Sequence, residues 1–131
     1  MAGKNRRRSI EVAGIAHSAP IPMGAVVGNM LFSSGIMGQD PKTGKLPEDP
    51  AKQAELAFLN MKTLVENAGG TLADIGKIAV FAKDNSMRQH VNDNWHKHFP
   101  DEHDRPARHF IVHDLPGGML VQLEIIAVLE K

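Results

Sequence analysis

The sequence lacks cysteine altogether. Disulfide bonds, thiolate nucleophiles and thiolate metal sites are therefore excluded, and the composition is typical of an intracellular protein. Long apolar runs are also missing, because no stretch reaches the roughly 18 residues that a membrane-spanning helix needs. Residues 1–9 are basic, but the apolar segment of a secretory signal does not follow them. We therefore expect a cytoplasmic protein with no membrane partner.

Net charge is a further absence, since 15 basic side chains balance 15 acidic ones. Such a chain has no general attraction to nucleic acid. The one local run of charge, Lys4 with Arg6, Arg7 and Arg8, is not interleaved with aromatic residues, as a nucleic-acid surface would be. We interpret residues 1–9 as a frayed, solvated basic tail, with a weak polyanion contact as the alternative. No nucleic-acid partner is expected.

What the sequence does contain is enough apolar residues, 42%, for the core of a single domain over residues 10–131. Short apolar runs rich in β-forming residues predict the strands. These runs lie at 10–12, at 25–34 with a fold at Gly28-Asn29, at 75–82, at 107–113 and at 119–129.

Two helices are expected between these strands. Asp49 and Pro50 are suited to the N-cap and first position of a helix whose apolar residues recur at helical spacing until Gly69-Gly70. The second helix has Asn85 or Ser86 as its expected cap.

The order of elements predicts an α+β fold with one mixed sheet. A strand–helix–strand unit implies parallel pairing through a crossover, whereas the hairpin at 25–34 and a second hairpin, joined by residues 115–118, imply antiparallel pairing. Both helices should cover one face of the sheet. The other face needs a cover too, and a second copy of the chain provides it best.

Short motifs follow one another in an order and spacing that resemble the RidA/YjgF family over residues from about 10 to 129. They are Gly28-Asn29-Met30-Leu31-Phe32-Ser33-Ser34-Gly35, Asp40-Pro41-Lys42-Thr43-Gly44, Gln53, Asn60, Ala68-Gly69-Gly70, Val91-Asn92, Pro106-Ala107-Arg108, Leu115-Pro116 and Glu124-Ile125-Ile126-Ala127. The resemblance implies a chorismate-mutase-like α+β fold and a homotrimer with active sites in the clefts between subunits. It also implies hydrolysis of reactive 2-aminoacrylate-type enamines and their imines to 2-oxoacids and ammonia.

The chain departs from the family pattern at several places that matter for chemistry. Ile21 stands where the family has a tyrosine, Ile36 where glutamine is common, Phe110 where cysteine is frequent and Gln122 where an acidic residue helps to place water. The family's arginine is kept as Arg108. The resemblance therefore implies the fold and a carboxylate-binding arginine, but it does not identify the substrate.

Arg108 is the main candidate for substrate binding. Its planar guanidinium matches a carboxylate bidentately and stays charged. By strand alternation Arg108, Phe110 and Val112 share one face of their strand, and we expect the sheet face that carries Arg108 and Gln122 to be buried between three subunits. The alternative is a structural ion pair across the trimer.

Three residues are candidates for placing the water molecule or transferring protons. The amide of Gln122 can hold a water molecule but cannot take its proton. Glu124, two residues on, is either a base or a buried structural carboxylate. His17 lies before a loop at Pro20 that lines the cleft in the family, and it either replaces the missing tyrosine in proton transfer or is an exposed loop residue.

The candidate site is completed by Ser34-Gly35, where a glycine lets the backbone approach a ligand or simply bends the chain. The predicted catalytic residues are thus Gln122, Glu124 and His17, and the predicted substrate-binding residues are Arg108, Ser34, Gly35, Ile21 and Phe110. We expect no cofactor and no metal, since the spacing of the histidines does not suit a shared ion.

The sequence thus predicts hydrolytic deamination of small 2-enamino or 2-imino acids, with a small carboxylate as the substrate. The alternative is a trimer without turnover that binds small carboxylates or acts like a chaperone. Ribonuclease activity is disfavoured by the balanced charge.

Overall fold

The computed structural model describes residues 6–130, so the part of the predicted basic tail at residues 1–5 lies outside the described residues. Strand β1 (Arg7–Ile10) begins earlier than the predicted strand at 10–12. It pairs antiparallel with β2, with Arg7 opposite Val27. The interpretation of Arg7 and Arg8 as part of a frayed tail is therefore wrong. An edge strand can hold its backbone in a sheet while its charged side chains stay in water, and both arginines are exposed.

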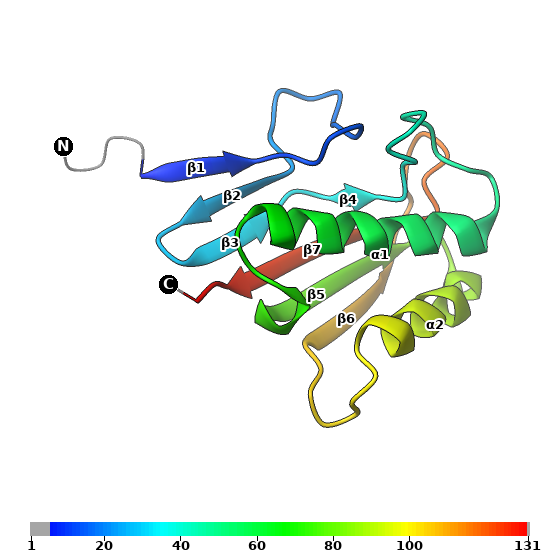
Figure 1. Cartoon of the computed structure of the whole chain (residues 1–131). Helices are drawn as coiled ribbons and strands as arrows, with labels where there is room; N and C mark the ends of the chain where they lie inside the picture. Colours follow the sequence, from blue (N-terminus) through cyan, green and yellow to red (C-terminus); the bar gives the residue numbers. More distant parts are fainter. Residues whose placement is uncertain (1–5, 131) are drawn as a thin grey trace.

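A mixed sheet of seven strands forms the centre of the described residues (Figure 1). After β1 come β2 (Gly24–Val27), β3 (Met30–Ser33), β4 (Ile36–Met37), β5 (Ile75–Ala82), β6 (Ala107–Val112) and β7 (Val121–Val128). Their order across the sheet is β1-β2-β3-β7-β5-β6, and β4 also pairs with β7. Only β5 and β6 pair in parallel among these strands. The predicted α+β fold, the mixed sheet and the hairpin β2–β3 are confirmed.

The second predicted hairpin is wrong. β6 pairs with β5 at the edge of the sheet, and β7 lies between β3 and β5 without pairing with β6. Burial explains the choice, because alternate residues of β7 from Val121 to Ala127 are fully buried and suit a central strand. β6 is only partly buried and suits an edge.

Helix α1 (Pro50–Asn67) begins and ends as the sequence predicts. The side chain of Asp49 accepts a hydrogen bond from the amide of Ala51. At the other end Gly69 has a φ of 97°, a left-handed conformation that favours glycine. The amide of Gly70 donates to the carbonyl of Val65 at 2.9 Å, which satisfies one of the last carbonyls of the helix.

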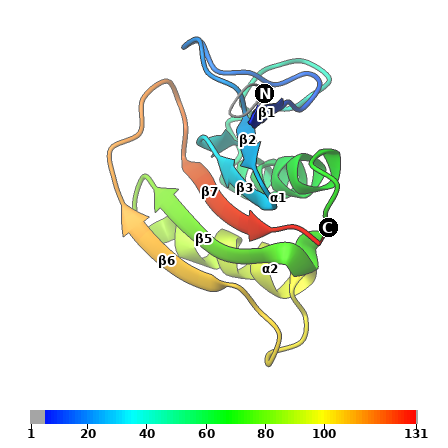
Figure 2. The same cartoon turned by 90° about the vertical axis from the view of Figure 1, so that its left-hand side faces the viewer.

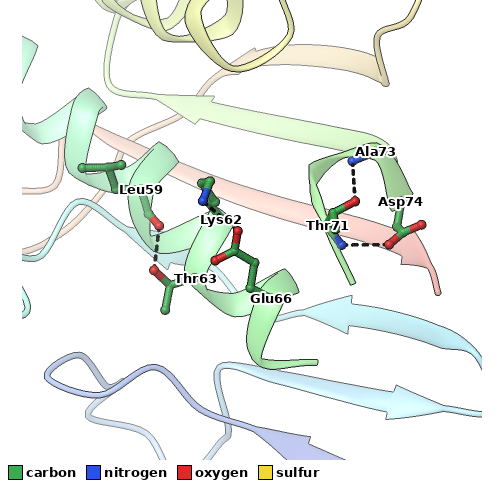
Figure 3. A network of polar contacts seen from close by, with 7 residues as sticks. All are labelled: Leu59, Lys62, Thr63, Glu66, Thr71, Ala73 and Asp74. Atoms are coloured by element: carbon green, nitrogen blue, oxygen red, sulfur yellow. Dashed lines mark hydrogen bonds and ion pairs between the residues drawn. The ribbon is translucent and has the colours of Figure 1, made fainter. Parts of the chain in front are cut away.

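Polar contacts hold the solvent side of α1 and the turn after it (Figure 3). Lys62 forms an ion pair with Glu66 at 2.7 Å, one helical turn on. Beyond the helix, Thr71 and Asp74 form a capping box around the short 3₁₀ helix η1 (Leu72–Asp74). Exposed pairs of this kind contribute little stability, but the capping box fixes where the chain turns into β5.

Helix α2 (Arg88–His98) follows a 3₁₀ turn, η2 (Asn85–Met87). The cap of this unit is Asp84, whose side chain accepts from the amide of Ser86, so the prediction of Asn85 or Ser86 as the cap is wrong by one residue or two. Both helices lie on one face of the sheet, as predicted (Figures 1 and 2). The core lies between them and the sheet, and among its fully buried side chains are Phe58, Met61, Ile78 and Leu123.

Candidate functional site

The predicted site residues fall on two faces of the sheet. Arg108 lies opposite Ile78, and Ile78 lies opposite Ile125, and both isoleucines are buried beneath the helices. Because residues directly opposite each other share a face, Arg108 points to the helix side. Gln122 lies opposite Phe81 and points to the other side. The expectation that Arg108 and Gln122 share one face is therefore wrong. The two residues lie on different strands, β6 and β7, and the register of β5 between these strands determines which residues of β6 and β7 point to the same face.

The first group of predicted site residues is the one around Gln122, on the side of the sheet away from the helices. It surrounds a cleft of about 390 Å³. His17 and Gln122 both line it, together with Gln39, Met37 and Met119. Nε2 of His17 is buried and has no hydrogen-bond partner within residues 6–130. The Gln122 amide lies 3.7 Å from the sulfur of Met119, a weak acceptor. Within the described residues, the His17 nitrogen is thus unpaired but shielded from solvent, and the Gln122 amide makes only a weak contact.

Ser34 and Gly35 lie beside this cleft, where the strand is interrupted between β3 and β4. A Cβ atom on Gly35 would lie 2.4 Å from the amide of Gln122, so only glycine leaves room for that side chain. The hydroxyl of Ser34 donates to the carbonyl of Pro22 at 2.8 Å. Within the gap, the amide of Ile125 donates to the hydroxyl of Ser33 at 2.8 Å in place of a backbone partner. The glycine thus leaves the space in which the Gln122 amide lies.

Two buried amides of α1, Gln53 and Asn60, hold the loops around the cleft. Nε2 of Gln53 donates to the carbonyl of Gly118 at 3.1 Å and its Oε1 accepts from the amide of Leu120 at 2.7 Å. Asn60 donates to the carbonyls of Met37 and Gln39, both at 2.9 Å. No role for these two amides was predicted from the sequence. The sequence did contain a signal for such a role, because the two polar residues lie on the otherwise apolar face of the helix, seven residues from each other.

The second group lies where β6 meets α2. The guanidinium carbon of Arg108 lies 4.8 Å from the centre of the Trp95 ring. That of Arg88 lies 4.0 Å from the centre of the Phe110 ring. These are cation–π distances, so each aromatic ring positions one guanidinium. Phe110 and Arg108, predicted to share a strand face, do so.

Arg108 lacks an anionic partner within the described residues. Its Nη1 is buried with no hydrogen-bond partner there, and no ion pair between Arg108 and a carboxylate is formed within residues 6–130. Burial lowers the pKa of Arg108 below its ordinary value, and the positive charge of Arg88 lowers it further. The guanidinium still stays protonated at neutral pH, so this is a partly desolvated cation ready for a carboxylate.

Two predicted site residues join neither group. Ile21 is 48% exposed on the loop before β2 and does not line the cleft. Glu124 is exposed on the side of the sheet away from the helices, so in the single chain it is not a buried carboxylate. Within the described residues, no group of three or more His, Asp or Glu side chains is arranged to hold a metal ion. No helix in the same part of the chain is long and apolar enough to cross a membrane.

Comparison with known proteins defines the class. Residues 11–129 match the family described as Endoribonuclease L-PSP. A curated relative from Escherichia coli K12, named 2-iminobutanoate/2-iminopropanoate deaminase, is 38% identical over 111 residues, which cover 83% of this chain and 87% of the relative. The chain therefore belongs to the RidA/YjgF family, also described as Endoribonuclease L-PSP.

Solved structures agree with this family. RidA from an Antarctic Psychrobacter species superimposes with a TM-score of 0.86 at 31% identity, covering 93% of this chain and 99% of that one. E. coli TdcF with bound serine gives a TM-score of 0.82 at 34% identity, covering 94% and 99%. The predicted family and fold are thus confirmed.

Proposed function

We propose that the protein hydrolyses small 2-enamino and 2-imino acids to 2-oxoacids and ammonia. The observation that carries the proposal is Arg108, a guanidinium held against Trp95 with a buried Nη1 that has no partner within residues 6–130. The curated relatives named as 2-iminobutanoate/2-iminopropanoate deaminases support it. So does the serine bound to TdcF, a small molecule that carries a carboxylate.

In the proposed reaction Arg108 binds the substrate carboxylate through two parallel hydrogen bonds. An enamine first takes a proton on carbon and becomes the iminium ion. Water then adds to the neighbouring C=N carbon and gives up a proton, which leaves a tetrahedral aminoalcohol. Protonation of its amino group and loss of ammonia, with release of the hydroxyl proton, give the 2-oxoacid. Because the iminium carbon is already electrophilic, placing the water supplies much of the rate.

The cleft residues are suited to this task. Gln122 can hold a water molecule through its amide, and Gly35 leaves room for that amide beside the strand break. His17 lines the same cleft, and its buried Nε2 has no hydrogen-bond partner within residues 6–130, so it is the group we assign to proton transfer. Ser34 stabilises the backbone at the strand break.

The two groups of site residues face opposite sides of one sheet, which favours a site shared between copies of the chain. We place Arg108 of one copy at the cleft of its neighbour, in a homotrimer. The uncovered side of the sheet supports this arrangement, because it exposes Phe32, Ile126 and Val128. Phe32 and Ile126 are direct cross-strand partners, so they form one continuous apolar surface, of the kind that another subunit covers.

The reactive nature of the substrate also bears on location. Because 2-enamino acids break down in water by themselves, an enzyme that acts on them has to meet them where they form. We place the protein in the cytoplasm, as its sequence predicts, and assign it no nucleic-acid partner.

The experiment supplies freshly generated 2-iminobutanoate to the purified protein and measures ammonia release. We expect release above the rate in buffer. Buffer-level release, together with saturable binding of 2-oxobutanoate, would instead favour the trimer without turnover. Degradation of RNA by the same preparation would contradict the assignment of no nucleic-acid partner.

A further inference from the structure

Arg88 is a second cation beside Arg108 that the proposed reaction does not use. It lies in the first turn of α2, and its guanidinium stacks on Phe110, two residues from Arg108 on the same face of β6. Arg88 itself is exposed. Two aromatic rings, Trp95 and Phe110, therefore hold two guanidinium groups next to each other at the edge of the sheet.

This arrangement is unfavourable without an anion. Like charges at short range repel each other, and the N-terminal end of a helix disfavours a cation. The nearest carboxylate in sequence, Asp84, is engaged by the amide and the hydroxyl of Ser86. The polar contact of Arg88 itself is with the side-chain oxygen of Asn85, at 3.4 Å. Within residues 6–130 neither arginine forms an ion pair.

The number of charges indicates the ligand. A monocarboxylate placed on Arg108 leaves the charge of Arg88 uncompensated, whereas a dicarboxylate neutralises both. Arg108 is also the more buried of the two, and its Nη1 has no partner in the described part of the chain, which suits the carboxylate next to the reacting carbon. Arg88, at the exposed rim, suits a carboxylate further along the substrate.

We propose that Arg88 is a specificity-determining residue that selects substrates with a second carboxylate, that is, 2-enamino or 2-imino dicarboxylic acids. This inference rests on the proposed function, since it names the substrate class of the same site. Stacking on Phe110 places the Arg88 guanidinium before the ligand arrives, so little side-chain freedom is lost on binding.

The test measures binding of two stable product-like acids, 2-oxoglutarate and 2-oxobutanoate, by calorimetry at low salt. For the unaltered protein we expect 2-oxoglutarate to bind about tenfold more tightly, the lower end of the range for a charged hydrogen bond. Arg88→Gln should remove this preference while affinity for 2-oxobutanoate stays within about twofold. Arg8→Gln is the matched control, because Arg8 is an exposed arginine on β1, and its preference should equal that of the unaltered protein.

Several results would overturn the inference. Equal affinity for the two acids, or a preference that survives Arg88→Gln, would show that Arg88 does not read a second carboxylate. A change in oligomer mass with Arg88→Gln would assign the arginine to a contact between copies instead. A further readout is the salt dependence, which should be steeper for 2-oxoglutarate in the unaltered protein and become equal for the two acids in Arg88→Gln.

Binding and turnover separate this inference from the proposed function. If the protein prefers 2-oxoglutarate through Arg88 but releases no ammonia from any imino acid, the recognition stands and the deaminase proposal fails. If it deaminates 2-iminobutanoate and 2-iminoglutarate equally well and binds their products equally, the deaminase stands and the role of Arg88 is refuted.

Discussion

Replacement of Arg108 separates its two conceivable uses, binding of a substrate and structural pairing between subunits. Arg108→Lys keeps the charge but loses the planar fork, and Arg108→Ala removes both. If the residue binds the substrate carboxylate, we expect 2-oxoacid affinity to fall by about 1.5–3 kcal/mol, or roughly 10- to 150-fold, in Arg108→Lys.

The structure indicates that the fold should tolerate these changes. Arg108→Ala loses the stacking on Trp95, worth about 0.5–2 kcal/mol. It also removes a cation whose pKa is lowered by burial and by Arg88, so the loss is partly offset. A buried ion pair between subunits, in contrast, would cost about 3–5 kcal/mol when one partner is removed.

The assay therefore combines melting temperature, oligomer mass and 2-oxoacid affinity for Arg108→Ala and Arg108→Lys. Arg8→Ala, at an exposed arginine remote from β6 in the sheet, is the control. A protein that keeps its mass and no longer binds 2-oxoacids agrees with substrate binding. Dissociation or unfolding of Arg108→Ala would refute that reasoning and establish the structural pair.

Three further predictions concern the cleft and the assembly. Gly35→Ala brings a Cβ to 2.4 Å from the Gln122 amide, the far end of a flexible side chain, so the amide should move aside with little loss of stability while kcat falls by about tenfold. An unchanged kcat would show that Gln122 has no role in catalysis. Gln53→Leu leaves the amide of Leu120 and the carbonyl of Gly118 without their partner and should cost about 3 kcal/mol in urea unfolding, whereas a loss below about 0.5 kcal/mol would mean that the loops rearrange. Ile126→Glu places a charge on the exposed apolar side of the sheet and should yield monomers by sedimentation, with Lys62→Glu on α1 as the control. A trimeric Ile126→Glu would place the interface elsewhere.

Local signals in the sequence predicted the elements well. Asp49, Pro50 and Gly69 define the ends of α1 because caps depend on a few neighbouring residues. β5 occupies the residues that its β-forming pattern predicts. The second helix was placed with less success, because Asp84 competes with Asn85 and Ser86 as the cap and all three are good cap residues.

The order of the strands in the sheet and the faces of the site residues could not be predicted from local patterns in the sequence. The order of β6 and β7 depends on which strand buries more surface in the finished sheet, and neighbours in the chain suggested a hairpin. The same limit affected the site, because the face on which Gln122 lies relative to Arg108 depends on the register of β5 between them. Arg88 was missed because its significance comes from Phe110, a contact between a helix and a strand.

The single amide of Gln53 binds three stretches of chain to one another, since it donates to Pro47 and Gly118 and accepts from Leu120. Residues around 118–120 can then separate from α1 only when these bonds break together. Hydrogen exchange at the Leu120 amide should accordingly follow global unfolding and not the local opening typical of loops. Met119, which lies between these residues and lines the cleft, is therefore held in place, and any widening of the cleft for an arriving molecule has to come from other lining segments, such as the one that carries His17.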